Sequence, residues 1–415
     1  MNRLLPLKTR IAALGGALLS LTICGNVFSA EDAQLDSYGG VMAYEFEPSG
    51  RFRLGKIGDR HCLITPEGHG FFSLGVTHTS GVARQAGEEQ DWFAGKFNSD
   101  WEAFSQHTAR NLSSWGYNNI GYDSPRELRQ LLPYLASTHP TATSRWRPDS
   151  QFSFPDVFDP VWQEEAKKDI QVMVERERGN SRLIGYYWTD IPQWDLVKAK
   201  RMRGANWVET IRNLPDTAPG KIAYQAFAKE NPDHTDEDFL GVIADIYYRV
   251  VGEENRRLDP EGIVFGERYL VGDFPEVVVK AALPWIDAIA FQPGGAKFDE
   301  KSCDRLYEMS GGKPIFLCDH QASFPTPLFR ETMWQQLPDQ EAVGEAHRQY
   351  LEAALAEPYI LGYHRCQYVD RFKDRKGVLK QGLLKADGTP YEVLVKTVTE
   401  NNRMALDAFA AIPTE

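Results

Sequence analysis

Several features that mark other protein classes are missing from this sequence of 415 residues. It has only five cysteines, and none shows the CxxC spacing that is typical of a zinc site. No run of lysine and arginine occurs beyond the N-terminus, and the formal net charge is -12, which argues against nucleic acid as a partner. No internal repeat is present, and no glycine-rich phosphate loop follows an apolar run.

Long apolar runs are also missing, apart from one near the N-terminus. The run "IAALGGALLSLTIC" follows Lys8 and Arg10 and is followed by small residues, which predicts a cleavable signal peptide over residues 1–30. The run is too short for a membrane span. The bulky residue before Cys24 makes a lipoprotein signal the less favoured alternative. We therefore expect a secreted or periplasmic protein without a membrane span.

Four cysteines remain after cleavage, namely Cys62, Cys303, Cys318 and Cys366. Export permits disulfides, but a chain of this length does not need them for stability. We expect free, buried thiols.

Short apolar runs alternate with amphipathic stretches along the rest of the chain. We predict strands at 71–76, 117–122, 131–137, 182–188, 262–266, 287–292, 313–318 and 359–368. We predict helices at 101–115, 161–178, 236–258, 275–285, 300–310, 340–356 and from 391 to about 410. Parallel strands need helix-length crossovers, so the eight units indicate a (β/α)8 TIM barrel over 71–410, with a doubly wound open sheet as the alternative.

Two further segments complete the expected organisation. Residues 31–70 alternate in polarity and turn at Pro66–Gly70, which predicts a short N-terminal β extension below the barrel. The segment 192–236 is long for a connection between a strand and a helix, and we expect this loop to shape a substrate site.

Polar side chains follow nearly every predicted strand, at the end where barrel enzymes carry their active site. They are Thr77, His78, Tyr122, Asp123, Thr189, Asp190, Trp194, Glu267, Arg268, Gln292, Asp319, His320, Gln321, His364, Arg365, Gln367 and Asp370. Any one of them is more often a cap or a loop residue than a catalyst. Together they suit a ligand rich in hydroxyl groups. No His/carboxylate spacing suggests a metal, and we expect no cofactor.

The stretch "LIGYYWTDIPQWD" places Asp190 between Trp188 and Trp194 at the end of an apolar strand. Indole rings stack on sugar faces, so we interpret the two tryptophans as walls of a sugar pocket. Filling of the core is the alternative for any tryptophan.

Several segments resemble the catalytic domain of the glycoside hydrolase family 50 β-agarases, which are barrels of clan A. The resembling stretches are "GHGFFSLGV", "WGYNNIGYDS", "FPDVFDPVW", "LIGYYWTDIPQWD", "GKPIFLCDHQASF", "EAHRQYLEAALAEPYILGYHRCQYVDR" and "GLLKADGTPYEVL". They cover most of residues 66–405 in the order of the family. The resemblance implies hydrolysis of a galactan-type polysaccharide, such as agar, porphyran or carrageenan, or of its oligosaccharides. Because no separate binding module is visible, we expect action on chain ends.

The sequence departs from the family at the catalytic positions. The family has Asp-Asn-Glu after the fourth strand, with the Glu as acid/base, where this chain has Thr189, Asp190 and Ile191. The nucleophilic Glu of the seventh strand corresponds to Asp319, and a tryptophan of the eighth strand corresponds to Arg365.

Three interpretations of these changes stay open. Asp319 and Asp190 form a rebuilt pair of carboxyl groups, or Asp319 acts with a proton donor that is Glu267, His320 or His364. In the third, the barrel binds sugar without cleaving it. Apart from these three interpretations, the resemblance places Asp190 where clan A barrels keep an Asn that contacts the 2-hydroxyl of the substrate, so Asp190 either takes part in catalysis or only binds a sugar hydroxyl. His78, Asp123, Arg268, Gln292 and Gln367 are further substrate-binding candidates.

Arg365 is a candidate for binding sulfate or carboxylate groups of the substrate, because a guanidinium pairs with such groups in bidentate geometry. A salt bridge to Asp370 or Glu267 is the alternative.

Overall fold

A computed structural model describes residues 33–85, 91–327, 329–373 and 378–414, all within the unit Asp32–Glu415. The predicted signal peptide lies outside the described residues, and the domain boundaries at 30 and 70 stay predictions. No described helix is long and apolar enough to cross a membrane.

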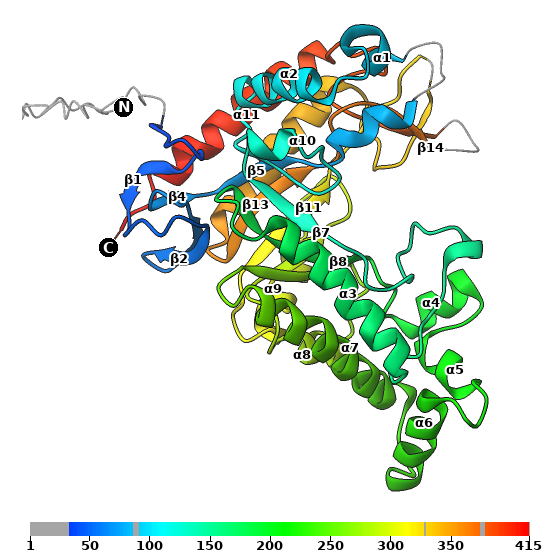
Figure 1. Ribbon diagram of the computed structural model, residues 1–415. Coiled ribbons are helices and arrows are strands. Elements are labelled where there is room, and N and C mark those ends of the chain that lie inside the picture. The colour runs from blue at the N-terminus through cyan, green and yellow to red at the C-terminus, as the bar shows by residue number, and fades with distance from the viewer. Residues whose placement is uncertain (1–32, 86–90, 328, 374–377, 415) are drawn as a thin grey trace, which may run out of the picture. The chain divides into compact units, whose positions relative to one another are not determined.

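Eight parallel strands close into a barrel (Figure 1). In order they are β5 (Ser73–Val76), β6 (Asn119–Ile120), β7 (Tyr134–Ser137), β8 (Leu183–Asp190), β9 (Val264–Leu270), β10 (Ile289–Gln292), β11 (Ile315–His320) and β13 (Ile360–Arg365). Each overlaps one predicted strand, so the predicted (β/α)8 barrel is confirmed. Strands β8 and β9 extend further toward the C-terminal rim than the apolar runs indicated.

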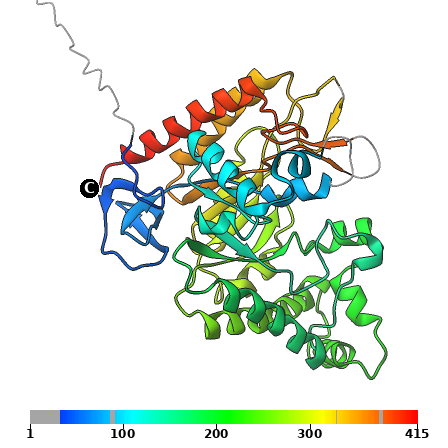
Figure 2. The same cartoon turned by 45° about the horizontal axis from the view of Figure 1, so that its top comes forward.

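The helices between these strands cover the barrel from outside. They are α2 (Trp101–Ser114), α3 (Pro160–Glu177), α7 (Asp236–Leu258), α8 (Glu276–Ala282), α9 (Glu300–Met309), α10 (Gln340–Ala356) and α11 (Glu392–Ala410). Helices α3, α7 and α8 lie side by side on one flank, and α10 lies along α11 on another (Figures 1 and 2). Local sequence sets their starts, because Asp159, Thr235 and Asp339 each cap a helix through their side chains.

The segment 192–236 is not the loop that we expect from its composition. It contains α4 (Leu196–Arg203), α5 (Trp207–Arg212) and α6 (Pro219–Glu230). Gly204 ends α4 in the left-handed conformation, with φ 75°, and Asn206 caps α5. Three short helices separated by such caps lack the long periodicity that reveals a helix in sequence. The further short elements are α1 (Trp92–Phe97), η1 (Thr79–Gln85), η2 (Leu128–Gln130) and η3 (Asp149–Gln151).

A small sheet lies at each end of the barrel. The N-terminal sheet, in the order β1 (Val41–Glu45), β4 (His69–Phe71), β3 (Arg60–Ile64) and β2 (Arg53–Ile57), closes the bottom, as predicted. Its Leu63 and Phe71 pack with barrel-interior residues such as Phe316. The second sheet, β12 (Glu331–Thr332), β15 (Val378–Lys380) and β14 (Arg371–Lys373), brings Lys380 to the opposite rim.

Side chains of each strand alternate between the barrel interior and the helix layer. On β11, Phe316 and Cys318 face the interior, whereas Ile315 and Leu317 face the helices. Cys62, Cys303, Cys318 and Cys366 are free and buried, as predicted.

Irregular pairing interrupts this alternation near the rim. The register shifts between Leu317 and His320 on β11 and between Tyr187 and Asp190 on β8. On β9, Gly266 has φ 69°, next to a further shift in pairing with β8. An extra residue in a strand moves all following side chains to the other face.

Candidate active site

A pocket of about 430 Å³ opens at the C-terminal ends of the barrel strands. Its lining is His78, Tyr122, Asp123, Arg129, Ser137, His139, Ser144, Trp146, Asp190, Arg268, Asp319, Met333, Arg371 and Lys380. Six of the polar residues predicted at the strand ends line it, namely His78, Tyr122, Asp123, Asp190, Arg268 and Asp319. The pocket is thus at the predicted place, but it is built in large part from other side chains.

Asp319 lies deep in this pocket and is only 3% exposed. Its Oδ1 accepts a hydrogen bond of 2.9 Å from the hydroxyl of Thr77 and lies 3.6 Å from Nε2 of His78. Burial alone would raise the pKa of Asp319, but the charge of Lys380 and the nearby His78 hold this pKa well below its usual range. The carboxylate is therefore ionised at neutral pH and available as a nucleophile or base.

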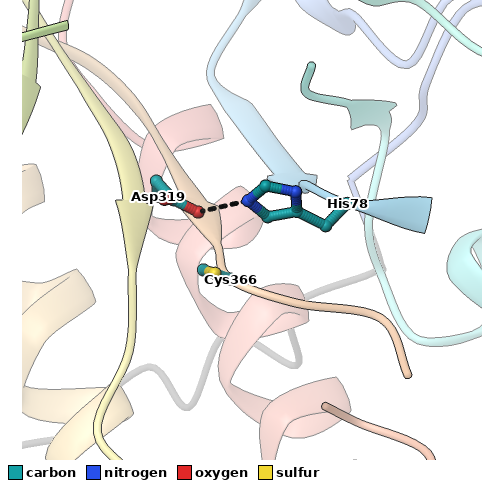
Figure 3. Close-up of side chains that lie close together, drawn as sticks. All are labelled: His78, Asp319 and Cys366. Atoms are coloured by element: carbon teal, nitrogen blue, oxygen red, sulfur yellow. Dashed lines mark ion pairs between the residues drawn. The ribbon is translucent and has the colours of Figure 1, made fainter. Parts of the chain in front are cut away.

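His78 is held between two carboxyl groups. Its Nδ1 lies 2.7 Å from Oδ2 of Asp123, while Nε2 faces Asp319 (Figure 3). His78, Asp123 and Asp319 all have positive φ, at 55°, 57° and 58°. Backbone strain of this kind costs about 1–3 kcal/mol per residue and clusters at functional sites.

Asp190, at the end of β8, also lines the pocket. Its Oδ1 accepts hydrogen bonds from Nε of Arg268, at 3.2 Å, and from the amide of Gln292. The guanidinium of Arg268 stacks on Tyr122, with 3.8 Å from Cζ to the ring centroid. Arg268 is 1% exposed, and its Nη1 has no hydrogen-bond partner within the described residues. Gln292 therefore contributes to the site by holding Asp190.

Sequence reasoning missed several lining residues. Trp146, in the loop after β7, is 42% exposed at the pocket. His139 accepts a hydrogen bond of 3.4 Å from the backbone of Asp190, and burial lowers its pKa to about 4. Lys380 comes from β15, far along the chain. Trp146 and Lys380 lie well beyond the end of any predicted strand, so the strand-end rule could not select them. His139 lies two residues after the predicted strand 131–137, as His78 does after 71–76, so the rule could have found it.

Glu267, a predicted catalytic residue, does not line the pocket. Its carboxylate accepts hydrogen bonds from the indole of Trp194 at 2.7 Å, from Tyr248 at 3.1 Å and from Tyr247. Burial raises the pKa of Glu267 to about 7, although these donors act in the other direction. The turn of the chain at Gly266 directs Arg268 to the pocket and Glu267 to helix α7.

The two tryptophans that we predict as pocket walls lie in the helix layer instead. The indole of Trp188 donates to Asn255 of α7 at 3.2 Å. The indole of Trp194 stacks on Trp207, with 4.4 Å between ring centroids. Both are fully buried, so the interpretation as sugar-contacting walls is wrong and the core-filling alternative holds.

Four more candidates at the strand ends do not line the pocket. His320 stacks on Tyr350 of α10, His364 contacts Ser73 inside the barrel, and Gln367 donates to the carbonyls of Val369 and Lys380. Burial lowers the pKa of His320 to about 4 and that of His364 to about 3, so both rings are neutral at pH 7.

Arg365 is the fourth of these candidates, and its role in binding anionic substrate groups stays a prediction. It is 1% exposed and lies outside the pocket lining. Within the described residues it forms no ion pair with Asp370 or Glu267, and its Nε and Nη2 have no hydrogen-bond partner.

Ile191, at the acid/base position of the family, is 1% exposed and has φ 46°. It does not line the pocket. Of the donors considered in place of the missing Glu, Glu267, His320 and His364 also lie outside the lining. The interpretation in which one of them protonates the leaving group therefore has no geometric support.

Two groups of side chains within the described residues have the composition of a metal site. His78, Asp319 and Cys366 bring their ligand atoms within 4.8 Å of one another at the pocket floor (Figure 3). Asp36, Glu67 and His69 do so in the N-terminal sheet, near the molecular surface. Sequence spacing does not indicate the first group, because its members come from the ends of three separate strands. In the second group only Glu67 and His69 are close in sequence.

Solved structures share this fold. An exo-beta-agarase is 16% identical, matches with a TM-score of 0.74, and the match covers 90% of this chain and 67% of that one. The agarase AgWH50C is 18% identical, with a TM-score of 0.75, and the match covers 91% of this chain and 67% of that one. BpGH50 is 19% identical, with a TM-score of 0.68, and the match covers 90% of this chain and 86% of that one. No protein-family model and no curated protein sequence matches. The resemblance to family 50 agarases is thus confirmed at the level of the fold.

Proposed function

We propose that this chain is an exported glycoside hydrolase that acts from the ends of galactan-type chains and uses Asp319 as nucleophile or base. The observation that carries the proposal is the buried, ionised carboxylate of Asp319 at the family's nucleophile position, facing a pocket in an agarase fold. The exposed indole of Trp146 supplies a stacking surface for a sugar ring at the same pocket.

The proposed reaction lacks the general acid of the family. Ile191 cannot donate a proton, and Asp190 is engaged by Arg268 and Gln292. General acid catalysis is worth about 10²–10⁴-fold. We therefore expect the natural linkage, whose leaving oxygen needs a proton, to be cleaved about that much more slowly than an activated aryl glycoside.

The basic side chains of the lining favour an anionic galactan, such as one with sulfate groups. Arg268 and Lys380 line the pocket, together with Arg371 and with Arg129, which pairs with Glu177. The buried, unpartnered Nη1 of Arg268 is a donor that a sulfate or carboxylate oxygen can satisfy.

The absence of a proton donor at Ile191 also favours a second candidate, a barrel that binds sugar without cleaving it. Incubation with agar, porphyran and carrageenan oligosaccharides and with activated aryl galactosides, followed by product analysis, separates the two. Products from the aryl substrates, formed by the wild type and not by Asp319→Asn, support the hydrolase. Binding of oligosaccharides with no product from any substrate contradicts it.

A further inference from the structure

Three potential metal ligands of different chemistry meet at the floor of the pocket. His78 follows β5, Asp319 lies near the end of β11, and Cys366 follows β13. Figure 3 shows the imidazole edge of His78 directed at the carboxylate of Asp319, with Cys366 beside them. One nitrogen, one oxygen and one sulfur atom, all within 4.8 Å, form a donor set that suits Zn²⁺ and related ions.

The separation between His78 and Asp319 fits two ligands of one ion. Nε2 and Oδ1 lie 3.6 Å apart, which is long for a hydrogen bond. Nitrogen and oxygen ligands bind zinc at roughly 2.0–2.2 Å, so neighbouring ligand atoms of a tetrahedral ion lie about 3.4 Å apart. Small rotations of the side chains suffice to reach this geometry.

The surroundings of His78 match the outer shell of a metal site. Asp123 holds Nδ1 at 2.7 Å, which orients the ring and leaves Nε2 as the metal-binding atom. Thr77 fixes Asp319 in the same way from the other side, at 2.9 Å. We propose that His78, Asp319 and Cys366 bind Zn²⁺ or a similar divalent transition-metal ion, with its fourth position open to the pocket.

Lys380 is the competing cation at this site. Its charge acts on Asp319 and on Cys366, and it lines the same pocket. A bound metal ion adds a second positive charge near this ammonium group, so the two cations compete for the negative charge of Asp319. The ion also replaces the thiol proton of Cys366, which leaves to solvent, so affinity for the ion rises with pH.

The test is a titration of the full chain with Co²⁺ after dialysis against a chelator, without any sugar. We expect about one ion per chain, with the near-ultraviolet charge-transfer absorption of a cobalt–thiolate bond, which added Zn²⁺ removes. Cys366→Ser should abolish this absorption, whereas Cys318→Ser, which removes another buried thiol, should keep it. Lys380→Met should tighten binding.

Two further variants distinguish the proposed site from the other group of possible metal ligands, Asp36, Glu67 and His69. Asp123→Asn, which leaves the three proposed ligands in place and weakens the hold on His78, should weaken Co²⁺ binding by about 10–100-fold. His69→Ala, in that other group, is the matched control and should leave the cobalt–thiolate absorption unchanged.

Absence of the absorption in the wild type, or its persistence in folded Cys366→Ser, overturns the proposal. The wild-type result does not depend on the folding of any variant. Because no substrate is present, the test does not depend on hydrolysis. A bound ion occupies the carboxylate that the proposed function uses as nucleophile or base, so hydrolysis belongs to the metal-free chain.

Discussion

Polar residues at the rim of this barrel belong to two sets that are neighbours in sequence. The pocket-facing set comprises Asp190, Arg268 and Asp319, and the helix-facing set comprises Glu267, His320 and Arg365. Glu267 directly precedes Arg268, and His320 directly follows Asp319, so position along a strand does not separate the sets. The two sets differ in the face of the strand from which their side chains extend.

The partners of the two sets differ as much as their directions. Asp190 accepts a hydrogen bond from Arg268, and the charge of Lys380 acts on Asp319, so each acidic side chain has a basic side chain near it at the cavity. Glu267 is bound by phenol and indole donors, and His320 stacks on Tyr350, so neutral aromatic side chains enclose them. We propose that the first set takes part in the chemistry, whereas Glu267 and His320 of the second set hold strands to helices.

The largest expected effect that separates the sets is on turnover at Asp319. Asp319→Asn keeps the shape of the side chain and removes its charge, so hydrolysis should fall by about 1000-fold. The helix-facing neighbour gives the control, because His320→Gln should keep turnover close to that of the wild type. Steady-state rates on an activated aryl galactoside measure both. Comparable losses in the two variants would contradict the division into sets.

The next largest expected effect is the contribution of Glu267 to the pH dependence of the free energy of unfolding. Its pKa in the folded chain is about 7, above the ordinary 4.5, so the folded state keeps a proton that the unfolded state releases. The free energy of unfolding should therefore decrease as pH rises from about 4.5 to about 7, by up to about 3 kcal/mol, and stay level above.

Urea titrations across this range measure the dependence for the wild type and for Glu267→Gln. The pKa of Asp370 is also raised to about 7, mainly by burial, so the variant should retain only part of the slope. Turnover should change little. An unchanged slope would mean that Glu267 does not hold a proton, and a collapse of turnover would place it in the catalytic set.

The fold of this chain is easier to predict from its sequence than the identity of its site residues. Alternation of strand and helix patterns predicts the barrel well, and the helix bounds 236–258 and 340–356 are confirmed. Their periodic apolar faces and clear caps explain the success. The pocket is also predicted at the right end of the strands.

The individual site residues are less predictable because bulges near the rim shift the alternation by one residue. On β9, Phe265 faces the interior, so regular alternation would direct Glu267 inward and Arg268 outward. The positive φ of Gly266 produces the opposite arrangement. Lys380 reaches the pocket from a sheet formed after the last barrel strand, and no local pattern reports such a long-range approach.

Arg268 of the pocket-facing set and Arg365 of the helix-facing set should differ in their effect on ligand binding. Arg268→Met should weaken binding of sulfated oligosaccharides by about 1.5–3 kcal/mol, the usual size for a hydrogen bond to a charged group, and spare neutral ones. Arg365→Met should not distinguish the two ligand classes, because Arg365 lies outside the pocket lining. Calorimetric titration with matched sulfated and neutral oligosaccharides gives both values. If Arg365→Met lost affinity for sulfated oligosaccharides alone, Arg365 and not Arg268 would be the residue that binds the sulfate group.

The smallest expected effect tests whether Asp190 transfers a proton or only holds the substrate. Its Oδ1 already accepts from Arg268 and Gln292, which suits a carboxylate that binds a sugar hydroxyl. Asp190→Asn should then lower kcat/KM by about tenfold, or 1.4 kcal/mol, for natural and activated substrates alike. A general acid behaves differently, because activated aryl groups leave without protonation. Loss confined to natural oligosaccharides would therefore identify Asp190 as the acid that replaces the missing Glu at position 191. Equal losses, together with slow cleavage of natural linkages by the wild type, would show that a barrel can keep its nucleophile after losing its proton donor.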